Sequence, residues 1–205
     1  MRATHTDIPL SAIKPFYKAP INPSTPNPES AIVKKTIQAL HLQPHVEGGY
    51  FVETDRDSLH IPNPFLSSKN YDYQTTVAAS EDNSTRSAST TIFYFLSPGS
   101  PLGSFHRNRG RTIHTLHSGR GRYVLIHVDK VDGKEKAHIE TFVVGHDLAK
   151  GEKLQWIVEG GKYKATYLLP DNDETGESNG LLISEVSFCR FFFCIFAVIV
   201  LVGLQ

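Results

Sequence analysis

Cysteine is nearly absent from this chain. Both cysteines, Cys189 and Cys194, lie in the last 17 of the 205 residues, so the body of the chain has none. A disulfide framework and a cysteine-ligated zinc site are therefore excluded for the main domain. The N-terminus also lacks the apolar stretch of a secretory signal, and we expect a cytoplasmic protein.

An excess of charge is absent too. Lys and Arg together number 21, as do Asp and Glu, so the formal net charge is zero. This balance gives no long-range attraction to nucleic acid or to an anionic membrane. We therefore expect a small-molecule ligand and no nucleic-acid partner. The length of the chain fits one domain.

Long hydrophobic runs are missing, with one exception at the C-terminus. Residues 188–204 are apolar apart from Arg190, and the unbroken part of 14 residues is shorter than the ~20 that a membrane-spanning helix needs. Three interpretations stay open: a membrane anchor, a buried element, or sequence foreign to the native protein. The third arises because Val186-Ser187 can be encoded by a splice-donor-like GTGAGT or GTAAGT.

The first 28 residues hold six prolines and predict a poorly ordered arm. A short helix is expected next, with Asn27 as N-cap, Pro28 in the first turn and Pro44 ending it. Its apolar stripe consists of Ile32, Val33, Ile37 and Leu40.

From residue 44 onwards, short β-rich runs alternate with turn residues. Asp132-Gly133 predicts a hairpin, and residues 61–86 predict a long loop. Many short strands without a second helical pattern indicate an all-β barrel or sandwich. We therefore divide the chain into an arm (1–28), a barrel domain with an N-terminal helix (29–186) and the apolar tail (187–205). The predicted strands are 50–53, 89–96, 112–116, 122–128, 138–144, 154–158, 164–169 and 181–186.

Three stretches carry candidate chemistry. Glu47-Gly48-Gly49 precedes an aromatic strand, where two glycines allow a sharp turn or a close approach of the backbone to a ligand. Residues 103–119 contain His106, His114 and His117; His114 and His117 fall on opposite faces of a strand, so the three histidines cannot all converge. Residues 155–165 read as strand, Gly-Gly turn, strand.

Taken in this order, five blocks resemble the cupin superfamily, and more narrowly its RmlC-like Cupin 5 group. The resemblance covers about residues 41–186. It implies a double-stranded β-helix barrel, often dimeric, with a pocket that opens from the barrel interior. The blocks are Glu47–Phe51 with Glu53-Thr54, Ser89–Tyr94, Ser104–Arg107, Gln155–Val158 and Ser184–Val186.

Departures from the family pattern bear on metal binding. The first-motif histidine of metal-binding cupins maps onto His106, but the glutamate expected six residues later is Thr112 and the second-motif histidine falls near Lys164. An ammonium does not ligate a metal. We expect no metal and no cofactor unless His106 and His114 converge with Glu53 or Glu185. The Pro-Gly-Phe segment that usually follows the last strand is also missing.

The resemblance implies a pocket for a sugar or sugar-nucleotide-like molecule, in a homodimer, and leaves open whether the protein is an enzyme. If it is an isomerase like the sugar-nucleotide 3,5-epimerases, His106 is the base, Tyr94, Tyr123 or Tyr167 is the acid, and Glu53 or Glu185 orients His106. Arg107, Arg109 or Arg111 would then hold the phosphates. If it only binds, the ligand-contacting residues are Glu47, Tyr50, Glu53, Phe105, Arg107, Arg111, His114, Trp156 and Glu185. A third alternative is a cupin domain tethered to a membrane by the tail.

Overall fold

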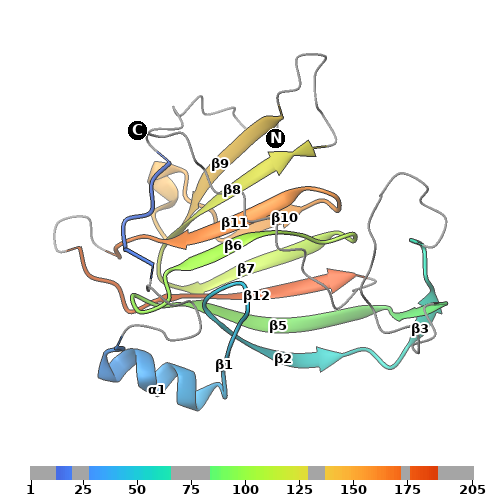
Figure 1. The fold of residues 1–205 in the computed structure, drawn as a ribbon, viewed down its shortest axis with the longest axis horizontal. Helices are drawn as coiled ribbons and strands as arrows, with labels where there is room; N and C mark the ends of the chain where they lie inside the picture. The colour runs from blue at the N-terminus through green and yellow to red at the C-terminus, as the bar shows by residue number, and fades with distance from the viewer. Residues whose placement is uncertain (1–12, 20–27, 66–83, 129–136, 172–175, 189–205) are drawn as a thin grey trace.

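A computed structural model describes residues 13–19, 28–65, 84–128, 137–171 and 176–188, and the fold is mostly β-sheet (Figure 1). Every pairing between two of the named strands is antiparallel. The elements are α1 (Ala31–Ala39), β1 (Gln43–Pro44), β2 (Tyr50–Arg56), β3 (His60–Pro62), β4 (Thr85–Ser87), β5 (Ser89–Leu96), β6 (Leu102–Arg107), β7 (Thr112–Ser118), β8 (Gly121–His127), β9 (His138–Val144), the 3-10 turn η3 (Leu148–Lys150), β10 (Gln155–Val158), β11 (Tyr163–Leu168) and β12 (Leu181–Phe188).

Two large sheets make the body of the molecule. One has six strands in the order β1-β2-β5-β12-β7-β10, and the other has four in the order β6-β11-β8-β9. A small third sheet pairs β3 with β4. The main core fills the space between the large sheets, with Leu116, Trp156 and Ile183 from the first and Tyr123 and Leu125 from the second. This confirms the predicted all-β fold.

The burial of every second side chain along a strand explains why most strands could be predicted from the sequence. In β7 the side chains of Thr112, His114 and Leu116 are buried while those between them are more exposed, as expected for a strand with one face on a core. The predicted strands 89–96 and 138–144 match β5 and β9 in full. Four strands were not predicted: β1, β3, β4 and β6. Two of these, β3 and β4, lie within or beside the segment 61–86 that we interpreted as a loop.

The helix begins and ends at residues other than those predicted. Its N-cap is Ser30, whose hydroxyl accepts a hydrogen bond from the Val33 N–H at 3.3 Å, while Asn27 lies outside the described residues. The helix ends at Ala39, and Pro44 lies in β1 opposite Tyr50. Its apolar side packs Val33 onto the outer face of the six-stranded sheet.

The arm is described only over residues 13–19. There Ile13 packs against Val124 and Tyr167 on the outer face of the four-stranded sheet, and the Tyr17 hydroxyl donates to the Gly176 carbonyl at 2.9 Å. The Asp132-Gly133 turn lies outside the described residues, although the strands on either side of it, β8 and β9, do pair.

The apolar tail beyond Phe188 also lies outside the described residues. Within the parts of the chain that the structure does describe, no helix is long and apolar enough to cross a membrane.

Candidate functional site

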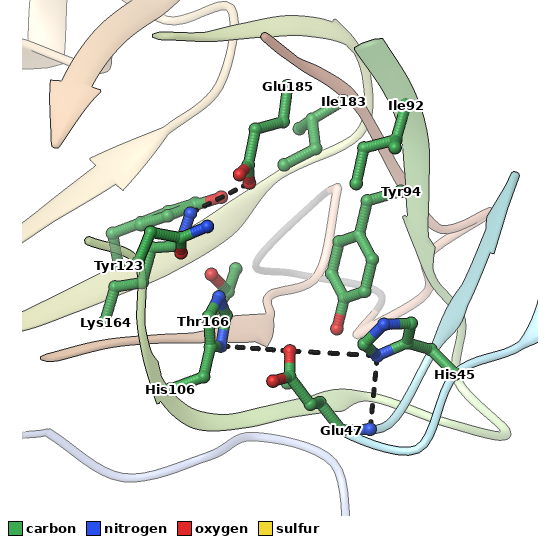
Figure 2. A pocket seen from close by; sticks show the side chains of 12 residues that line it. His45, Glu47, Ile92, Tyr94, His106, Tyr123, Lys164, Thr166, Ile183 and Glu185 are labelled. Carbon is green, nitrogen blue, oxygen red and sulfur yellow. Dashed lines mark hydrogen bonds and ion pairs between the residues drawn. The ribbon is translucent and has the colours of Figure 1, made fainter. Parts of the chain in front are cut away.

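A cavity of about 50 Å³ lies between the two large sheets (Figure 2). Such a volume accommodates a small polar group and a few water molecules. Ile92 and Ile183 form an apolar wall, and the remaining lining is mostly polar. The side chains that carry charge or can transfer a proton are His45, Glu47, Tyr94, His106, Lys164 and Glu185.

Strand register places His106 beside Lys164. Lys164 on β11 pairs with His106 on β6 and with Leu125 on β8. Alternation along β11 turns Lys164 and Thr166 toward the same interior face, and both are buried. The sequence therefore places a lysine in the interior of the molecule, which requires a partner for its charge.

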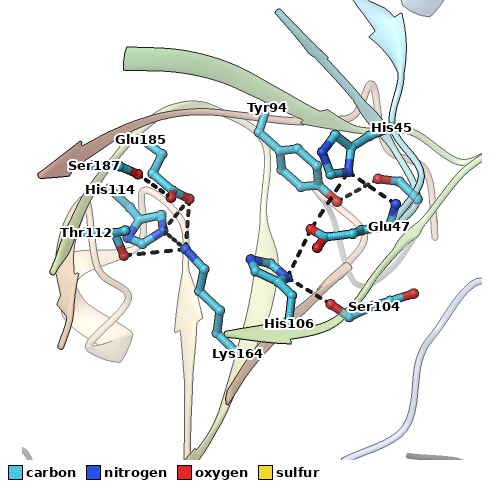
Figure 3. A network of polar contacts seen from close by, with 11 residues as sticks. His45, Glu47, Tyr94, Ser104, His106, Thr112, His114, Lys164, Glu185 and Ser187 are labelled. Carbon is cyan, nitrogen blue, oxygen red and sulfur yellow. Dashed lines mark hydrogen bonds and ion pairs between the residues drawn. The ribbon is translucent and has the colours of Figure 1, made fainter. Parts of the chain in front are cut away.

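That partner is Glu185, at the centre of what we call the lysine network: Thr112, His114, Lys164, Glu185 and Ser187 (Figure 3). The Lys164 ammonium donates to Glu185 Oε2 at 2.8 Å and lies 3.0 Å from His114 Nε2. It also donates to the Thr112 hydroxyl at 3.4 Å, and the Ser187 hydroxyl donates to Glu185 Oε1 at 3.1 Å. The network thus contacts both carboxylate oxygens of Glu185.

The charges of the lysine network are mutually dependent. Burial alone would raise the pKa of Glu185, but the Lys164 ammonium and His114 outweigh burial and hold that pKa well below its usual range. Burial and the same ammonium lower the pKa of His114. The His114 ring is stacked on Trp156, with centroids 5.2 Å apart. Near neutral pH the network therefore consists of a buried ion pair beside a neutral imidazole.

On the other side of the cavity lies a second set, the histidine network: His45, Glu47, Tyr94, Ser104 and His106 (Figure 3). Glu47 Oε2 lies 3.2 Å from His106 Nδ1 and 3.7 Å from His45 Nδ1. The two histidine side chains are 20% and 15% exposed, whereas that of Lys164 is 3% exposed. The histidine network is therefore the part of the cavity nearer to solvent.

Glu47 reaches His106 because Gly48 allows the chain to turn against β6. Gly48 has a φ of 96°, and a Cβ there would lie 2.0 Å from the Leu102 carbonyl oxygen. The Ser104 N–H donates to the Glu47 carbonyl at 2.7 Å, which fastens the turn to β6. The sequence predicted a turn or a close approach to a ligand, and the structure shows a turn packed against backbone.

The tautomer of His106 follows from its neighbours. Its Nδ1 lies 3.0 Å from the Ser104 carbonyl oxygen and 3.2 Å from the Glu47 carboxylate. Both are acceptors here, so Nδ1 carries the proton. Burial and the Lys164 ammonium lower the pKa of His106 to about 3, so the ring is neutral and Nε2 is an unprotonated acceptor.

Two tyrosines line the cavity with their hydroxyl protons in place. Tyr94 donates to the Gly48 carbonyl at 2.8 Å. Burial, with a further contribution from Glu47, raises the pKa of Tyr94 well above its ordinary value. Burial also raises the pKa of Tyr123, whose ring packs edge-on against Trp156. Both groups are neutral at physiological pH.

The structure brings some of the predicted site residues together and separates others. Glu47, Tyr94, His106, Tyr123 and Glu185 all line the cavity. His114 is completely buried behind Glu185, and Trp156 lies in the core on the far side of His114.

Other predicted ligand-contacting residues have different partners. Tyr50 lies in the core beneath α1 and its hydroxyl donates to Glu29. Arg107 lies over the Tyr163 ring, and Arg111 forms an exposed ion pair with Glu159.

Two further predictions are corrected by the register and packing. Phe105 packs on the outer cluster beside Val124 rather than lining the cavity. Glu53 pairs with Arg56 at 2.7 Å, so the carboxylate beside His106 is Glu47 and not Glu53 or Glu185. The second proposed phosphate ligand, Arg109, and the alternative acid, Tyr167, are not part of the lining either.

Sequence reasoning missed His45 as a site residue and treated Lys164 only as a poor metal ligand. The signal for His45 was its place two residues before Glu47, next to the Gly-Gly turn. Lys164 could have been recognised because it lies on the same face of a predicted strand as Thr166 and Leu168. If that face is buried, the lysine side chain must point inward. His117, the third histidine considered, is exposed and contacts Phe93.

The family pattern raises the question of a metal, and the donor set does not fit one. His114 Nε2 and Glu185 Oε2 both contact the Lys164 ammonium, and His106 Nδ1 faces a carbonyl. Among the described residues, no group of three or more His, Cys, Asp or Glu side chains is arranged to hold a metal ion. The fixed ammonium occupies the position where His114 and Glu185 would otherwise meet a cation.

Comparison with known proteins is consistent with this picture. Residues 34–199 match the family model described as "Cupin superfamily (DUF985)". The uncharacterized protein YML079W of Saccharomyces cerevisiae is 39% identical over 190 residues, covering 91% of this chain and 83% of the yeast protein.

Two solved structures resemble the fold. A hypothetical protein from Leishmania major has a TM-score of 0.59 at 25% identity, covering 77% of this chain and 81% of the other. Protein SO0799 from Shewanella oneidensis has a TM-score of 0.52 at 20% identity, with coverages of 78% and 79%.

Proposed function

Because the chain belongs to the cupin superfamily, in the group known as DUF985, we propose that its cavity binds a small, neutral, hydroxyl-bearing group, such as one edge of a sugar. The observation that carries the proposal is the set of acceptors on the side of the cavity nearer to solvent. The unprotonated Nε2 of His106 and the Glu47 carboxylate belong to that side, whereas the Lys164 ammonium contacts Thr112, His114 and Glu185.

The charges of the lining favour a neutral ligand. Glu185 compensates the charge of Lys164, and Glu47 adds a second carboxylate. A phosphate or carboxylate inside the cavity would approach these two carboxylates without an uncompensated cation to bind it. Of the arginines proposed from the sequence to hold phosphates, Arg111 is paired with Glu159 at the surface and Arg107 lies over the Tyr163 ring.

Hydroxyl groups match this lining because each can donate one hydrogen bond and accept others. The Glu47 carboxylate and the His106 imidazole can accept the hydrogen of a ligand hydroxyl. Ligand sites of this kind combine an apolar wall with a few well-placed polar groups, here Ile92 and Ile183 beside the two networks.

The test is a binding screen by calorimetry with three ligand classes: neutral monosaccharides, sugar phosphates and sugar nucleotides. We expect a neutral sugar to bind, and His106→Ala to weaken that binding about five- to twelvefold, since one hydrogen bond in a cavity contributes about 1–1.5 kcal/mol. His117→Ala is the matched control, because His117 is an exposed histidine on β7.

Binding confined to the phosphorylated classes would contradict the neutral-ligand proposal. So would equal affinities for wild type, His106→Ala and His117→Ala, provided that the melting temperatures show all three proteins to be folded.

A second candidate function is a sugar isomerase or epimerase in which His106 is the general base. One observation favours it: a carboxylate, Glu47, lies beside His106 Nδ1, as in enzymes where a carboxylate orients the base. A pKa of about 3 makes His106 a weak base, so binding is the better supported function. Solvent deuterium incorporated into a bound sugar by wild type, and lost in His106→Ala, would establish the isomerase.

A further inference from the structure

We infer that Asn108 is a further ligand-contacting residue of the cavity, and that Asn108 and His106 together bind two hydroxyls on neighbouring carbons. The inference rests on the proposed function and defines the ligand class more closely, as a vicinal diol. The side-chain oxygen of Asn108 accepts the hydrogen of one hydroxyl, and Nε2 of His106 accepts that of the other.

Asn108 belongs to the lining of the cavity and follows His106 by two residues. Side chains two positions apart on an extended chain lie on the same face. Arg107, which stands between them, lies over the Tyr163 ring and is not part of the lining. The alternation of β6 therefore continues one residue past its end and places Asn108 on the same face as His106.

The backbone of Asn108 is held by the neighbouring strand. Its carbonyl accepts a hydrogen bond from the Gly161 N–H at 2.8 Å, directly beyond the pairing of Arg107 with Tyr163. Because this bond exists before any ligand is bound, binding does not have to order the backbone at Asn108.

The side-chain amide of Asn108 carries an unmatched acceptor. Its Oδ1 is buried and has no hydrogen-bond partner among the residues that the structure describes. Burying an acceptor without a donor costs free energy that an apolar side chain of similar size would avoid. The fold therefore gains nothing from this oxygen, whereas a ligand hydroxyl that donates to it would remove the cost.

His106 supplies the second acceptor. Its Nδ1 faces the Ser104 carbonyl, so Nε2 is unprotonated, and the ring lines the cavity (Figure 2). Two residues of extended chain span about 7 Å. Two hydroxyls on neighbouring carbons can bridge acceptors at this spacing through hydrogen bonds of about 2.8 Å. A ligand with one hydroxyl would match one acceptor and leave the other unmatched.

The first test separates binding from stability. Asn108→Leu replaces the amide by an apolar side chain of similar size. We expect its urea unfolding midpoint to equal or exceed that of wild type, because the unmatched acceptor is gone. We expect its affinity for glycerol and D-glucose, measured by ligand titration, to fall about five- to twelvefold, as the loss of one hydrogen bond implies.

Thr90→Val is the matched control. The Thr90 hydroxyl on β5 is also buried without a partner in the described parts of the chain, but Thr90 does not line the cavity. We expect this variant to keep the affinity of wild type. Equal affinities for Asn108→Leu and Thr90→Val would overturn the inference. So would an unfolding midpoint of Asn108→Leu below that of wild type, because the amide would then serve the fold.

The contact itself is visible in the ¹H–¹⁵N spectrum of ¹⁵N-labelled wild type. The side-chain NH₂ signal of Asn108 is assigned by its loss in Asn108→Leu, and the ring signals of His106 by their loss in His106→Gln. We expect both sets to shift on titration with glycerol. With 1,3-propanediol, which lacks the middle hydroxyl, we expect the same shifts to need at least about fivefold higher concentrations, since one hydrogen bond is lost.

The outcomes distinguish this inference from the proposed function. Shifts at His106 alone, or equal affinities for glycerol and 1,3-propanediol, would overturn the role of Asn108 and leave the proposed function intact. If neither residue responds to glycerol or D-glucose, the proposed function fails and the inference fails with it.

Discussion

The two sides of the cavity are built from similar residue types and differ in what their charges do. The lysine network joins a carboxylate, a histidine and an ammonium that are at most 10% exposed, and the contacts described for it are made within the protein. The histidine network joins a carboxylate to two histidines that remain partly exposed. The same chemistry thus serves internal charge compensation on one side and, in our proposal, recognition on the other.

The difference lies in the partner of each carboxylate. Glu185 faces a permanent cation that burial makes indispensable, because an isolated buried charge is very unfavourable. Glu47 faces the imidazoles of His45 and His106, and the Nδ1 of His106 also faces the Ser104 carbonyl. We therefore expect changes in the lysine network to act mainly on stability, and changes in the histidine network to act mainly on binding and pH dependence.

The largest expected effect comes from removing the ammonium. Lys164→Met leaves Glu185 buried without its cation, and breaking a buried ion pair in this way typically costs about 3–5 kcal/mol. Denaturant unfolding measures the loss. Lys150→Met is the matched control: Lys150 pairs with Asp147 at the surface with 68% of its side chain exposed, so we expect a change within about 0.5 kcal/mol.

A double variant separates two contributions to this loss of stability: the unpaired charge of buried Glu185, and the lost packing of the Lys164 side chain. Lys164→Met combined with Glu185→Leu removes both charges, and replacing a buried pair by apolar groups is often much less costly than breaking it. We expect the double variant to be more stable than Lys164→Met alone. Equal or lower stability would show that the ammonium acts through contacts other than Glu185.

The sequence predicted the fold better than the site, and the reasons are local. Alternation in β7 and β12 follows from burial of one face, so period-two patterns found those strands. Strand β6, which carries His106, was missed because Gly103 and Ser104 interrupt its apolar pattern. A missed strand removes its register, and the neighbours of His106 could not be predicted without it.

The distance along the chain between His106 and its carboxylate partner also explains why the sequence analysis named the wrong carboxylate. Glu47 lies 59 positions before His106 and reaches it only because Gly48 turns the chain against Leu102. From the sequence alone, Glu53 is an equally good candidate partner for His106, but in the structure its carboxylate forms an ion pair with Arg56, three residues later. Local patterns identify which residues carry chemistry; the register decides which of them meet.

The second prediction concerns pH and separates the two networks further. His106 has a pKa of about 3 in the folded protein against about 6.5 when unfolded, so between these values the unfolded chain binds more protons. Stability is then unaffected by His106 above about pH 6.5 and falls as the pH drops toward 3. For one group the slope is at most about 1.4 kcal/mol per pH unit.

His106→Gln isolates that contribution. We expect its unfolding free energy, measured by denaturant titration across this window, to fall less steeply with acid than that of wild type. His114 and Glu185 are present in both proteins and, to a first approximation, cancel in the difference. Parallel curves for the two proteins would mean that His106 is not held in the neutral form by its surroundings.

The smallest expected effect tests how the Glu47 turn is held. Tyr94→Phe removes the hydroxyl that donates to the Gly48 carbonyl at 2.8 Å, and one such bond contributes about 0.5–1.5 kcal/mol. Tyr163→Phe is the control, since it keeps the ring that packs under Arg107, and we expect a change below about 0.5 kcal/mol. If Tyr94→Phe is as mild as the control, the Ser104 N–H bond to the Glu47 carbonyl suffices to fix the turn. If it costs more and also weakens sugar binding, the hydroxyl positions Glu47 and its two histidines as well as stabilising the fold.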